Sequence, residues 1–410
     1  MNLELLNSRF RRSFPRVPLA VPYWSGETYR NIRRCIASGE IIAGPDLVEL
    51  KRQLVEYFGV PDIVLCGSGS LALELALRVC DLRAGDEVII PSFCCSTVVA
   101  PILAVGAIPV LADVGHELNV TLETVDAVRT RKTRAVIVAH LFGNPADIGA
   151  IAELGNANNF VVIDDAAQAL GATIDDQPAG SCGDMGVVSF GAEKVCFGLG
   201  GGALVSHSYG VLDAARQIVL GYPSVGSTLA RLASTVVLRR WRGWTLPLHP
   251  LLSRGHERSP DAPPADYRQE ILANLSAAVA CSLMDSLAEN LRARRARVDA
   301  YSELLGECDA LELIAHRPGS ACLTQVIRVL PRSAGDRATA LIAALGAAGI
   351  EVQGSYMPIH LLGWARQAVW DRLPFTNQVW ADLVELPCEP SVSMDEVENI
   401  AAVVKRVLAA

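Results

Sequence analysis

The chain has 410 residues, of which 51% are hydrophobic and 20% are charged, and its formal net charge is −8. This length is sufficient for two domains and a large core, and the hydrophobic content excludes a disordered chain. The negative charge argues against a general nucleic-acid-binding protein. The eleven cysteines are scattered without a CxxC pair, which indicates reduced thiols in the cytoplasm.

Neither a signal peptide nor a membrane span is expected. The first residues have no apolar segment of the kind that directs secretion. The most apolar run, residues 98–112, is interrupted by Pro101, Gly106 and Pro109 and is too short to cross a bilayer. This run is interpreted as a helix followed by a buried strand.

Helices and strands alternate through the first 165 residues. An irregular N-terminal arm covers residues 1–30, and Asp46 is expected to cap a helix with Leu50 and Leu54 on its apolar face. The expected helices are 28–38, 46–58, 71–79 and 146–154, and the expected strands are 63–65, 87–91, 107–113, 135–139 and one beginning at Val161. Such alternation predicts a mostly parallel sheet that binds ligands at the carboxyl ends of its strands.

The turn at residues 67–70, Gly-Ser-Gly-Ser, precedes the predicted helix 71–79. A glycine-containing turn at a helix N-terminus presents free N–H groups and the positive end of the helix dipole, and both favour phosphate. Alone, this motif is more typical of an ordinary strand–helix turn with a serine cap. The residues downstream make the phosphate site the stronger interpretation.

The segment 161–205 carries the chemistry. A buried strand ends in Asp164 and Asp165, Gln168 follows in a turn, and a second apolar run leads to Ser189. Lys194 comes five residues later, shortly before the glycine run 198–202. An acid, a hydroxyl and a lysine beside a glycine run are suited to a phosphorylated aldehyde with a cationic ring. The segment therefore predicts pyridoxal 5'-phosphate (PLP), with Lys194 forming the Schiff base.

Residues 209–266 depart from this alternation and are interpreted as a helical excursion followed by a proline-rich linker. Apolar residues at helical spacing lie beside a basic and aromatic run, Arg239 to Trp244. Such a pattern also fits contact with a membrane surface or a lipid-linked substrate. A packed helix over the active site, or at a subunit interface, is the favoured interpretation.

The C-terminal third is predicted to form a smaller α+β domain. A long helix is expected over residues 268–306, with Arg292, Arg294, Arg295 and Arg297 on its solvated side. Strands 323–330 and 350–353, a helix 335–348 and a final helix that Asp395 caps or opens follow. The expected division is a large domain, 1–266, and a small domain, 267–410.

These segments together resemble the DegT/DnrJ/EryC1/StrS sugar aminotransferases, which are PLP enzymes of fold type I. Each motif is weak alone, and the resemblance rests on their shared order over more than 300 residues. They are SGE at 38–40, AGP at 43–45, SGSLAL at 68–73, GDEVI at 85–89, GAIPV at 106–110, HLFGNPAD at 140–147, DDAAQ at 164–168, Ser189 with Lys194, GGG at 200–202, YMPIH at 356–360 and LPC at 386–388.

The resemblance implies a role for each site residue. Lys194 matches the lysine that binds the PLP aldehyde and acts as general base. Asp165 matches the carboxylate that keeps the pyridinium nitrogen protonated, whereas Asp164 is expected to be structural. Gln168 matches a residue near the cofactor O3' atom. The phosphate cradle corresponds to Ser189, Gly69 and Ser70. A homodimer with its active site at the subunit interface is also implied.

Two positions depart from the family pattern. Cys95 stands where the family has an aromatic ring stacked on the cofactor, so either stacking is lost or another ring such as Phe93 replaces it. The family also has an Asn-Tyr-Arg segment that binds phosphate from the partner subunit. Tyr267-Arg268 resembles a remnant of that segment, and Asn274 is a candidate replacement for the missing asparagine.

Transamination is the leading hypothesis, with an amine moved from L-glutamate or L-glutamine to a keto compound. Keto sugars, cyclitols, carrier-bound sugars and non-sugar ketones all remain open as acceptors. One alternative is a PLP-dependent dehydratase, but the dehydratases of this family carry histidine in place of Lys194. The other alternative is a non-catalytic scaffold that has kept the fold.

Overall fold

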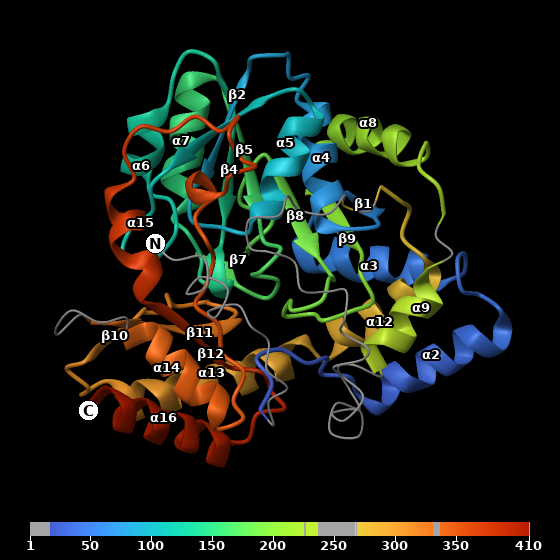
Figure 1. The fold of residues 1–410 in the computed structure, drawn as a ribbon. Helices are drawn as coiled ribbons and strands as arrows, with labels where there is room; N and C mark the ends of the chain where they lie inside the picture. Colours follow the sequence, from blue (N-terminus) through green and yellow to red (C-terminus); the bar gives the residue numbers. More distant parts are fainter. Residues whose placement is uncertain (1–16, 225–226, 237–266, 268, 331–336, 410) are drawn as a thin grey trace.

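A computed structural model describes residues 17–224, 227–236, 267, 269–330 and 337–409 (Figure 1). Its largest element is a seven-stranded sheet in the order β1-β9-β8-β5-β4-β2-β3. The strands are β1 (Asp62–Cys66), β2 (Glu87–Pro91), β3 (Ile108–Ala112), β4 (Thr133–Ala139), β5 (Val161–Asp165), β8 (Met185–Ser189) and β9 (Gly202–Ser206).

Most pairs in this sheet are parallel, as predicted. β2 pairs in parallel with β3 and β4, and β5 pairs in parallel with β4 and β8. Only β9 runs the other way, antiparallel to both β8 and β1. The loops that follow β1, β2, β4, β5 and β8 therefore leave the sheet at one common edge.

Helices cover both faces of the sheet (Figure 1). Val88 and Ile90 of β2 face one core cluster, while Ile89 between them faces another, which is the period of two expected of a strand buried on both sides. The first face is covered by α4 (Gly69–Val79), α5 (Val99–Ala104) and α8 (Tyr209–Val219). The second is covered by α6 (Leu122–Val128), α7 (Ile148–Asn158) and α3 (Asp46–Phe58).

The C-terminal part contains a second, three-stranded antiparallel sheet in the order β10-β11-β12. Its strands are β10 (Leu311–Leu313), β11 (Thr324–Val329) and β12 (Leu383–Pro387). Its helices are α13 (Leu287–Leu305), α14 (Arg337–Ala347) and α16 (Met394–Ala409), and they share one hydrophobic core with the sheet. The short helix α15 (Pro374–Val379) lies between β11 and β12 in the sequence.

The remaining helices pack beside the large sheet. α2 (Gly26–Ser38) and α3 both contact α12 (Asn274–Asp285). The described part of the predicted excursion, 209–266, contains α8 and α9 (Thr228–Ser234). A small hairpin joins β6 (Thr173–Ile174) to β7 (Gln177–Pro178). The division into domains at residue 266 stays a prediction, because α12 lies beyond that boundary and packs against the N-terminal helices.

The structure corrects the prediction of one long helix over residues 268–306. Two helices are present, and the backbone leaves helical geometry at Ser286, where φ is −97° and ψ is 6°. The expected solvated arginine face is also wrong in part. Arg294 is fully buried and Arg297 is only 8% exposed, because each donates to carbonyl oxygens of segments distant in sequence.

Three smaller expectations also change. Asp46 is the first residue of α3 and not its cap, and its carboxylate binds Arg34 and Asn274 instead. The last helix is capped by Ser393, whose hydroxyl accepts from the Glu396 N–H at 3.2 Å. Residues 350–353 form no strand and make only isolated bridges to Val17 and Glu385.

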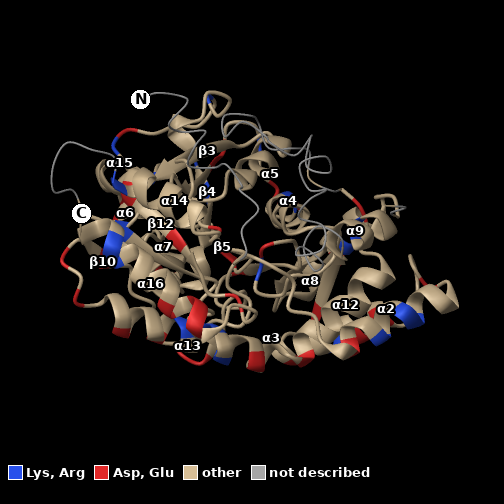
Figure 2. Cartoon of the chain, turned by 60° about the horizontal axis from the view of Figure 1, so that its bottom comes forward, with Lys and Arg blue, Asp and Glu red and all other residues tan. Residues whose placement is uncertain are grey.

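Charged residues of both signs are distributed along the outer helices α2, α3 and α13 (Figure 2). The described helices include none with the length and hydrophobicity needed to cross a bilayer. The basic and aromatic run 239–244, which motivated the membrane-surface hypothesis, lies outside the described residues.

Candidate active site

One pocket opens where the loops after β1, β2, β4, β5 and β8 converge, at the carboxyl edge of the parallel strands. All seven predicted site residues line it. They are Gly69, Ser70, Cys95, Asp165, Gln168, Ser189 and Lys194. The position agrees with the general location of ligand sites in open parallel sheets.

Asp165 ends β5 and is 6% exposed. Burial raises the pKa of its carboxyl, against the lowering effects of the Ala167 N–H at 3.0 Å and of the Lys194 side chain. A buried carboxylate in such a pocket is stabilised in its charged form by a cationic partner. Asp165 is therefore suited to a ligand that carries a positive ring N–H.

The neighbouring acid, Asp164, is structural, as predicted. Its Oδ1 atom lies 2.6 Å from His140 Nε2, and its Oδ2 atom accepts from the N–H groups of Gly180 and Cys182 at 2.8 and 2.9 Å. The carboxylate is fully buried and does not line the pocket. Successive residues of β5 thus point to opposite faces, and only Asp165 reaches the site.

Gln168 lies in the turn after β5 and is 7% exposed. Its side-chain oxygen accepts from the Phe142 N–H at 3.0 Å. That hydrogen bond assigns the orientation of the amide, and it leaves the Gln168 NH₂ group as the donor for a ligand in the pocket. Phe142 itself has a left-handed backbone, with φ of 58°.

The N-terminus of α4 forms one wall of the pocket. Ser68 caps the helix, with its hydroxyl accepting from the Leu71 N–H at 3.1 Å. Gly69 packs so closely on Ser189 that a Cβ atom added there would lie 2.9 Å from Ser189 Cβ. The helix N-terminus and the Ser189 hydroxyl therefore meet at one point, where both can bind an anion.

Lys194 lies in the turn that connects β8 to β9. The preceding residue, Glu193, has a left-handed backbone with φ of 63°. The turn closes through Phe190, whose carbonyl accepts from the N–H groups of Gly198 and Gly200 at 3.2 Å. This arrangement brings the lysine back over the carboxyl end of β8, into the same pocket as Asp165.

Cys95 lines the pocket and is partly exposed, and its sulfur lies 3.1 Å from Thr97 Oγ1. The alternative that Phe93 replaces the stacking ring is wrong. Phe93 is fully buried and packs on Phe142 and Tyr356, with ring centroids 6.3 and 6.1 Å away. Among the described residues that line the pocket, none is Phe, Tyr or Trp.

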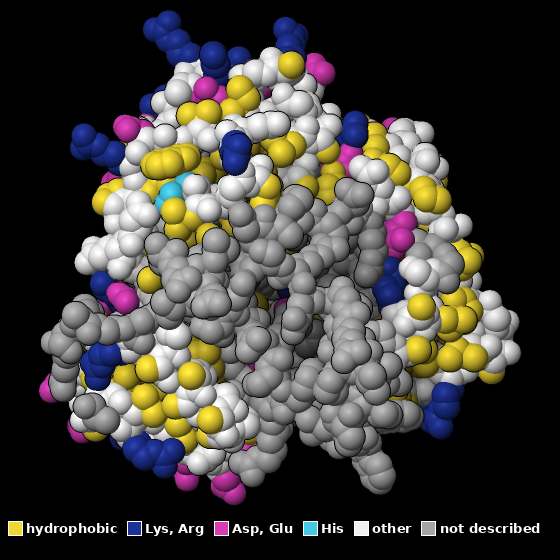
Figure 3. All heavy atoms as spheres, viewed as in Figure 1, with side chains coloured by type: hydrophobic (Ala, Val, Ile, Leu, Met, Phe, Trp, Pro, Cys, Tyr) yellow, Lys and Arg dark blue, Asp and Glu magenta, His cyan; other side chains and the backbone are white. Residues whose placement is uncertain are grey.

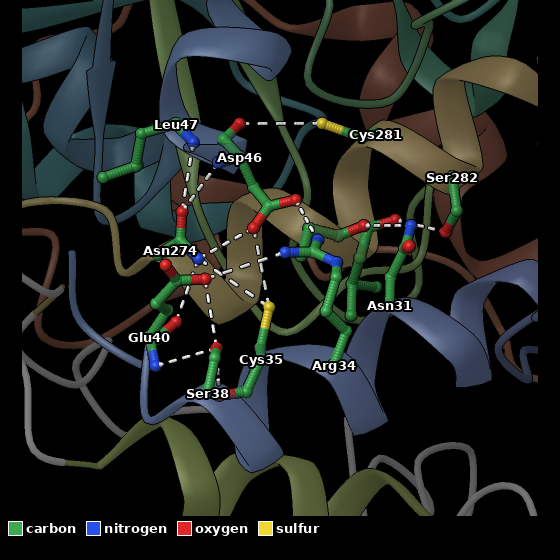
Figure 4. A network of polar contacts seen from close by, with 12 residues as sticks. Asn31, Arg34, Cys35, Ser38, Glu40, Asp46, Leu47, Asn274, Cys281 and Ser282 are labelled. Carbon is green, nitrogen blue, oxygen red and sulfur yellow. Dashed lines mark hydrogen bonds and ion pairs between the residues drawn. The ribbon is translucent and has the colours of Figure 1, made fainter. Parts of the chain in front are cut away.

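Asn274 is fully buried with both amide atoms bonded inside its own subunit, so its predicted role as a ligand for phosphate in the partner subunit is also wrong. It is fully buried between α12, α2 and α3 (Figure 4). Its oxygen accepts from the N–H groups of Asp46 and Leu47, and its nitrogen donates to the Glu40 carbonyl and to the Asp46 carboxylate. Asn274 instead fixes the start of α3.

Tyr267, in the proposed remnant of the phosphate-binding segment, donates to Glu74 of α4 at 2.6 Å. Glu74 is fully buried and also accepts from Gln269 and Tyr222. This contact anchors the end of the excursion to the helix whose N-terminus lines the pocket. Arg268 lies outside the described residues.

His140 is the pocket residue that the sequence did not assign. It follows β4 directly, and its fully buried ring lies between Asp164 and the Ala146 N–H, which donates to Nδ1 at 2.9 Å. The sequence could have indicated this residue, because a histidine directly after a predicted parallel strand lies at the edge where ligands bind. Within the described residues, no group of three or more His, Cys, Asp or Glu side chains is arranged to hold a metal ion.

The donor set matches the parts of PLP. The pocket provides a buried carboxylate for a cationic ring nitrogen, an amide donor, an amine, and a helix N-terminus with a hydroxyl for a phosphate. The close approach of Gly69 to Ser189 leaves the helix N–H groups uncovered by any side chain at that position.

A model of the DegT/DnrJ/EryC1/StrS aminotransferase family matches residues 23–405. The GDP-perosamine synthase of Vibrio cholerae is 26% identical over 398 residues, which cover 95% of this chain and 98% of that protein. The structure of aminotransferase TlmJ from Streptoalloteichus hindustanus has a TM-score of 0.78 at 24% identity, covering 96% of this chain and 99% of that one.

A second solved structure is an E. coli GDP-4-keto-6-deoxy-D-mannose-3-dehydratase with bound hydrated PLP. Its TM-score is 0.76 at 20% identity, over 95% of this chain and 100% of that one. These two structural likenesses establish the fold type, with a mostly parallel central sheet flanked by helices.

Proposed function

Because the chain belongs to the DegT/DnrJ/EryC1/StrS aminotransferase family, we propose that it transfers an amino group from an amino acid to a keto sugar or a related keto compound. The predicted enzyme class and cofactor are confirmed, since the matching model is that of an aminotransferase family whose enzymes use PLP. The observation that carries the proposal is that Lys194, Asp165 and the N-terminus of α4 line one pocket.

Lys194 is proposed to hold the cofactor and to move the proton. The bound cofactor supplies an aldehyde that takes up the amino group and a ring that stabilises negative charge. The Lys194 amine, once displaced by the amino donor, stays in the pocket and can remove the proton from the donor's Cα atom. A positioned base of this kind contributes roughly 10²–10⁴-fold in rate.

The other pocket residues are proposed to bind and orient the cofactor. Asp165 pairs with the cationic ring nitrogen, and the available NH₂ group of Gln168 donates to the ring oxygen. Ser189, Gly69 and Ser70 bind the phosphate through a hydroxyl and the helix N-terminus. Cys95 lines the same pocket and would contact the cofactor with a thiol in place of the aromatic ring of the family.

The proposed amino donor is L-glutamate or L-glutamine, and the proposed acceptor class is a keto sugar. Support for a sugar comes from the name of the Vibrio cholerae relative, a GDP-perosamine synthase. Keto cyclitols, carrier-bound sugars and non-sugar ketones are tested alongside, because no described residue of the pocket discriminates among them.

A donor–acceptor screen read by mass spectrometry tests this proposal. The purified protein is incubated with each amino donor and with keto sugars, keto cyclitols and simple keto acids in parallel. The expected product carries NH₂ in place of the keto oxygen and contains ¹⁵N when ¹⁵N-labelled donor is used. A product that has lost water and gained no nitrogen would contradict transamination and support elimination.

A homodimer is proposed as well. Ile36 of α2, Val48 of α3 and Leu229 of α9 are exposed hydrophobic residues, at 49%, 73% and 47%. Figure 3 shows hydrophobic side chains gathered at its right edge, where α9 lies in Figure 1. Sedimentation velocity tests the state, and a monomer at micromolar concentration contradicts it.

A cytoplasmic location is proposed on the basis of the thiols. All eleven cysteines lie in the described part of the chain, and all are free. Free thiols of this number are typical of a reducing compartment. Fractionation of cells that express the full chain, with recovery in the cytosolic fraction, tests the location.

A further inference from the structure

The turn that carries Lys194 is held from outside by a buried side chain. Asn290 of α13 donates from Nδ2 to the carbonyl oxygen of Val195, the residue after Lys194, at 3.1 Å. Both residues are 2% exposed, so water does not compete for this hydrogen bond. The indole of Trp24 holds the same turn at a second carbonyl, that of Phe197, at 3.0 Å.

The Asn290 side chain is itself fixed by Arg294, one helical turn further along α13. Arg294 donates from Nε to Asn290 Oδ1 at 2.8 Å, which assigns the amide orientation and directs its NH₂ group at Val195. The fully buried guanidinium also donates to the Leu323 carbonyl at 2.9 Å and to Glu389 Oε1 at 2.7 Å. Each end of the Arg294 fork therefore has a fixed partner.

The buried ion pair of Arg294 and Glu389 is not explained by its contribution to stability alone. A buried ion pair is on average no more stabilising than hydrophobic side chains of similar volume. Arg294 and Glu389 are 0% and 2% exposed, and their pair connects α13 to the segment after β12. The ion pair fixes the Arg294 guanidinium, which in turn orients the Asn290 amide toward the Val195 carbonyl beside Lys194.

We propose that Asn290 and Arg294 are positioning residues for Lys194. The relay runs from Glu389 through Arg294 and Asn290 to the Val195 carbonyl, and it sets where the Lys194 amine lies relative to Asp165 and the α4 N-terminus. This inference rests on the proposed function, in which Lys194 binds the cofactor aldehyde. The property that the relay controls is the effective concentration of the Lys194 amine at that aldehyde.

The substitution Asn290→Asp tests the relay with almost no change in shape. An aspartate at this position still accepts from Arg294 but cannot donate to the Val195 carbonyl. The probe is methylamine, a small free amine that competes with Lys194 for the aldehyde of the holoenzyme. Borohydride reduction followed by mass spectrometry of the Lys194 peptide measures the fraction of cofactor still attached to the lysine.

In the Asn290→Asp protein, the methylamine concentration that displaces half of the cofactor from Lys194 is expected to fall about tenfold, because a slightly misplaced amine has a lower effective concentration. Arg294→Lys, which keeps the charge but loses the Nε–H donor to Asn290, is expected to shift it in the same direction. This second variant keeps the test informative if the first does not fold.

Arg297→Lys is the matched control, since Arg297 lies on the same helix and donates to the Pro390 and Val392 carbonyls without reaching the Lys194 turn. It is expected to lower the melting temperature and leave the methylamine midpoint unchanged. An unchanged midpoint in both relay variants, or an equal shift in the control, would overturn the proposal. A wild-type protein with no cofactor trapped on Lys194 would instead overturn the proposed function.

Discussion

His140 Nε2 lies 2.6 Å from Asp164 Oδ1, and neither side chain is exposed to solvent. Because His140 Nδ1 accepts from the Ala146 N–H, the proton of the neutral ring is on Nε2, which donates to Asp164. The strand ends of β4 and β5 are thereby joined directly beneath the pocket. The two adjacent acids of β5 differ in position, since Asp164 joins the strand ends and Asp165 lines the pocket.

The substitution Asp164→Asn should therefore reduce stability and leave the cofactor site in place. The asparagine NH₂ group would face either the His140 Nε2–H or the backbone N–H groups of Gly180 and Cys182, so at least one buried donor loses its partner. A loss of about 1–3 kcal/mol in the free energy of unfolding is expected, measured by urea denaturation. If cofactor binding were lost at unchanged stability, Asp164 would belong to the site and not to the frame.

Gly69→Ala should weaken cofactor binding. The added methyl group would lie 2.9 Å from Ser189 Cβ and 3.2 Å from its hydroxyl, which forces apart the two groups proposed to bind phosphate. The expected increase in the PLP dissociation constant is about tenfold or more, or roughly 1.4 kcal/mol, measured by equilibrium dialysis.

Gly149→Ala is the matched control for this glycine substitution. Gly149 lies in α7, and a Cβ atom there would have no neighbour within 4 Å. The control should keep wild-type PLP affinity and gain about 0.4–1 kcal/mol of stability. Equal PLP affinities in the two alanine variants would contradict a close contact between α4 and the phosphate.

Glu385 should make stability depend on pH near neutrality. The pKa of this carboxyl is raised from 4.5 to about 7. Burial is the main cause and the Glu193 charge adds to it, while the Gln353 hydrogen bond acts in the opposite direction. Since the folded protein binds the proton more tightly than the unfolded chain, this contribution is complete below pH 4.5 and is lost as pH rises through 7.

The substitution Glu385→Gln isolates this effect. Urea denaturation at pH 5.5 and at pH 8 should show that the wild type loses more stability with rising pH than the variant does. The excess approaches about 1.4 kcal/mol for each pH unit inside the window. Parallel pH profiles for the two proteins would show that Glu385 is already charged in the folded state at pH 5.5.

Cys95→Phe should tighten cofactor binding. Cys95 lines the pocket at its partly exposed wall, and the lining residues described there include no Phe, Tyr or Trp side chain. A ring at this position can stack on the cofactor, which is worth about 0.5–1.5 kcal/mol, or roughly a threefold to tenfold lower dissociation constant. Fluorescence titration with PLP measures it, with Cys95→Ala as the control for loss of the thiol. Weaker PLP binding by the phenylalanine variant would contradict a position of the cofactor ring beside residue 95.

The site could be predicted because its residues follow the rule for parallel sheets. Asp165 and Ser189 end apolar runs that had to be buried strands, and the carboxyl ends of parallel strands meet at one edge. The position of Lys194 between Ser189 and the glycine run predicted its role as the Schiff-base lysine, and the family resemblance supported it. The role of Gln168 came from the family resemblance alone.

Other features depend on contacts that local sequence does not encode. Arg294 has the spacing of an exposed helical residue, yet its partner Glu389 is 95 residues away. Asn274 is predicted to bind phosphate, whereas its partners Asp46 and Leu47 lie on α3, 228 and 227 residues earlier. A buried polar residue is identified only by its partners, so its burial could not be predicted from periodicity.

The visible absorption spectrum of the purified protein tests the central claim most directly. The wild type should show the absorbance of PLP bound to a lysine, and this absorbance should convert to that of the aminated cofactor when L-glutamate or L-glutamine is added. Lys194→Ala should lose both the lysine-bound absorbance and turnover. Absorbance near that of the wild type in the Lys194→Ala protein would contradict the assignment of Lys194 as the cofactor lysine.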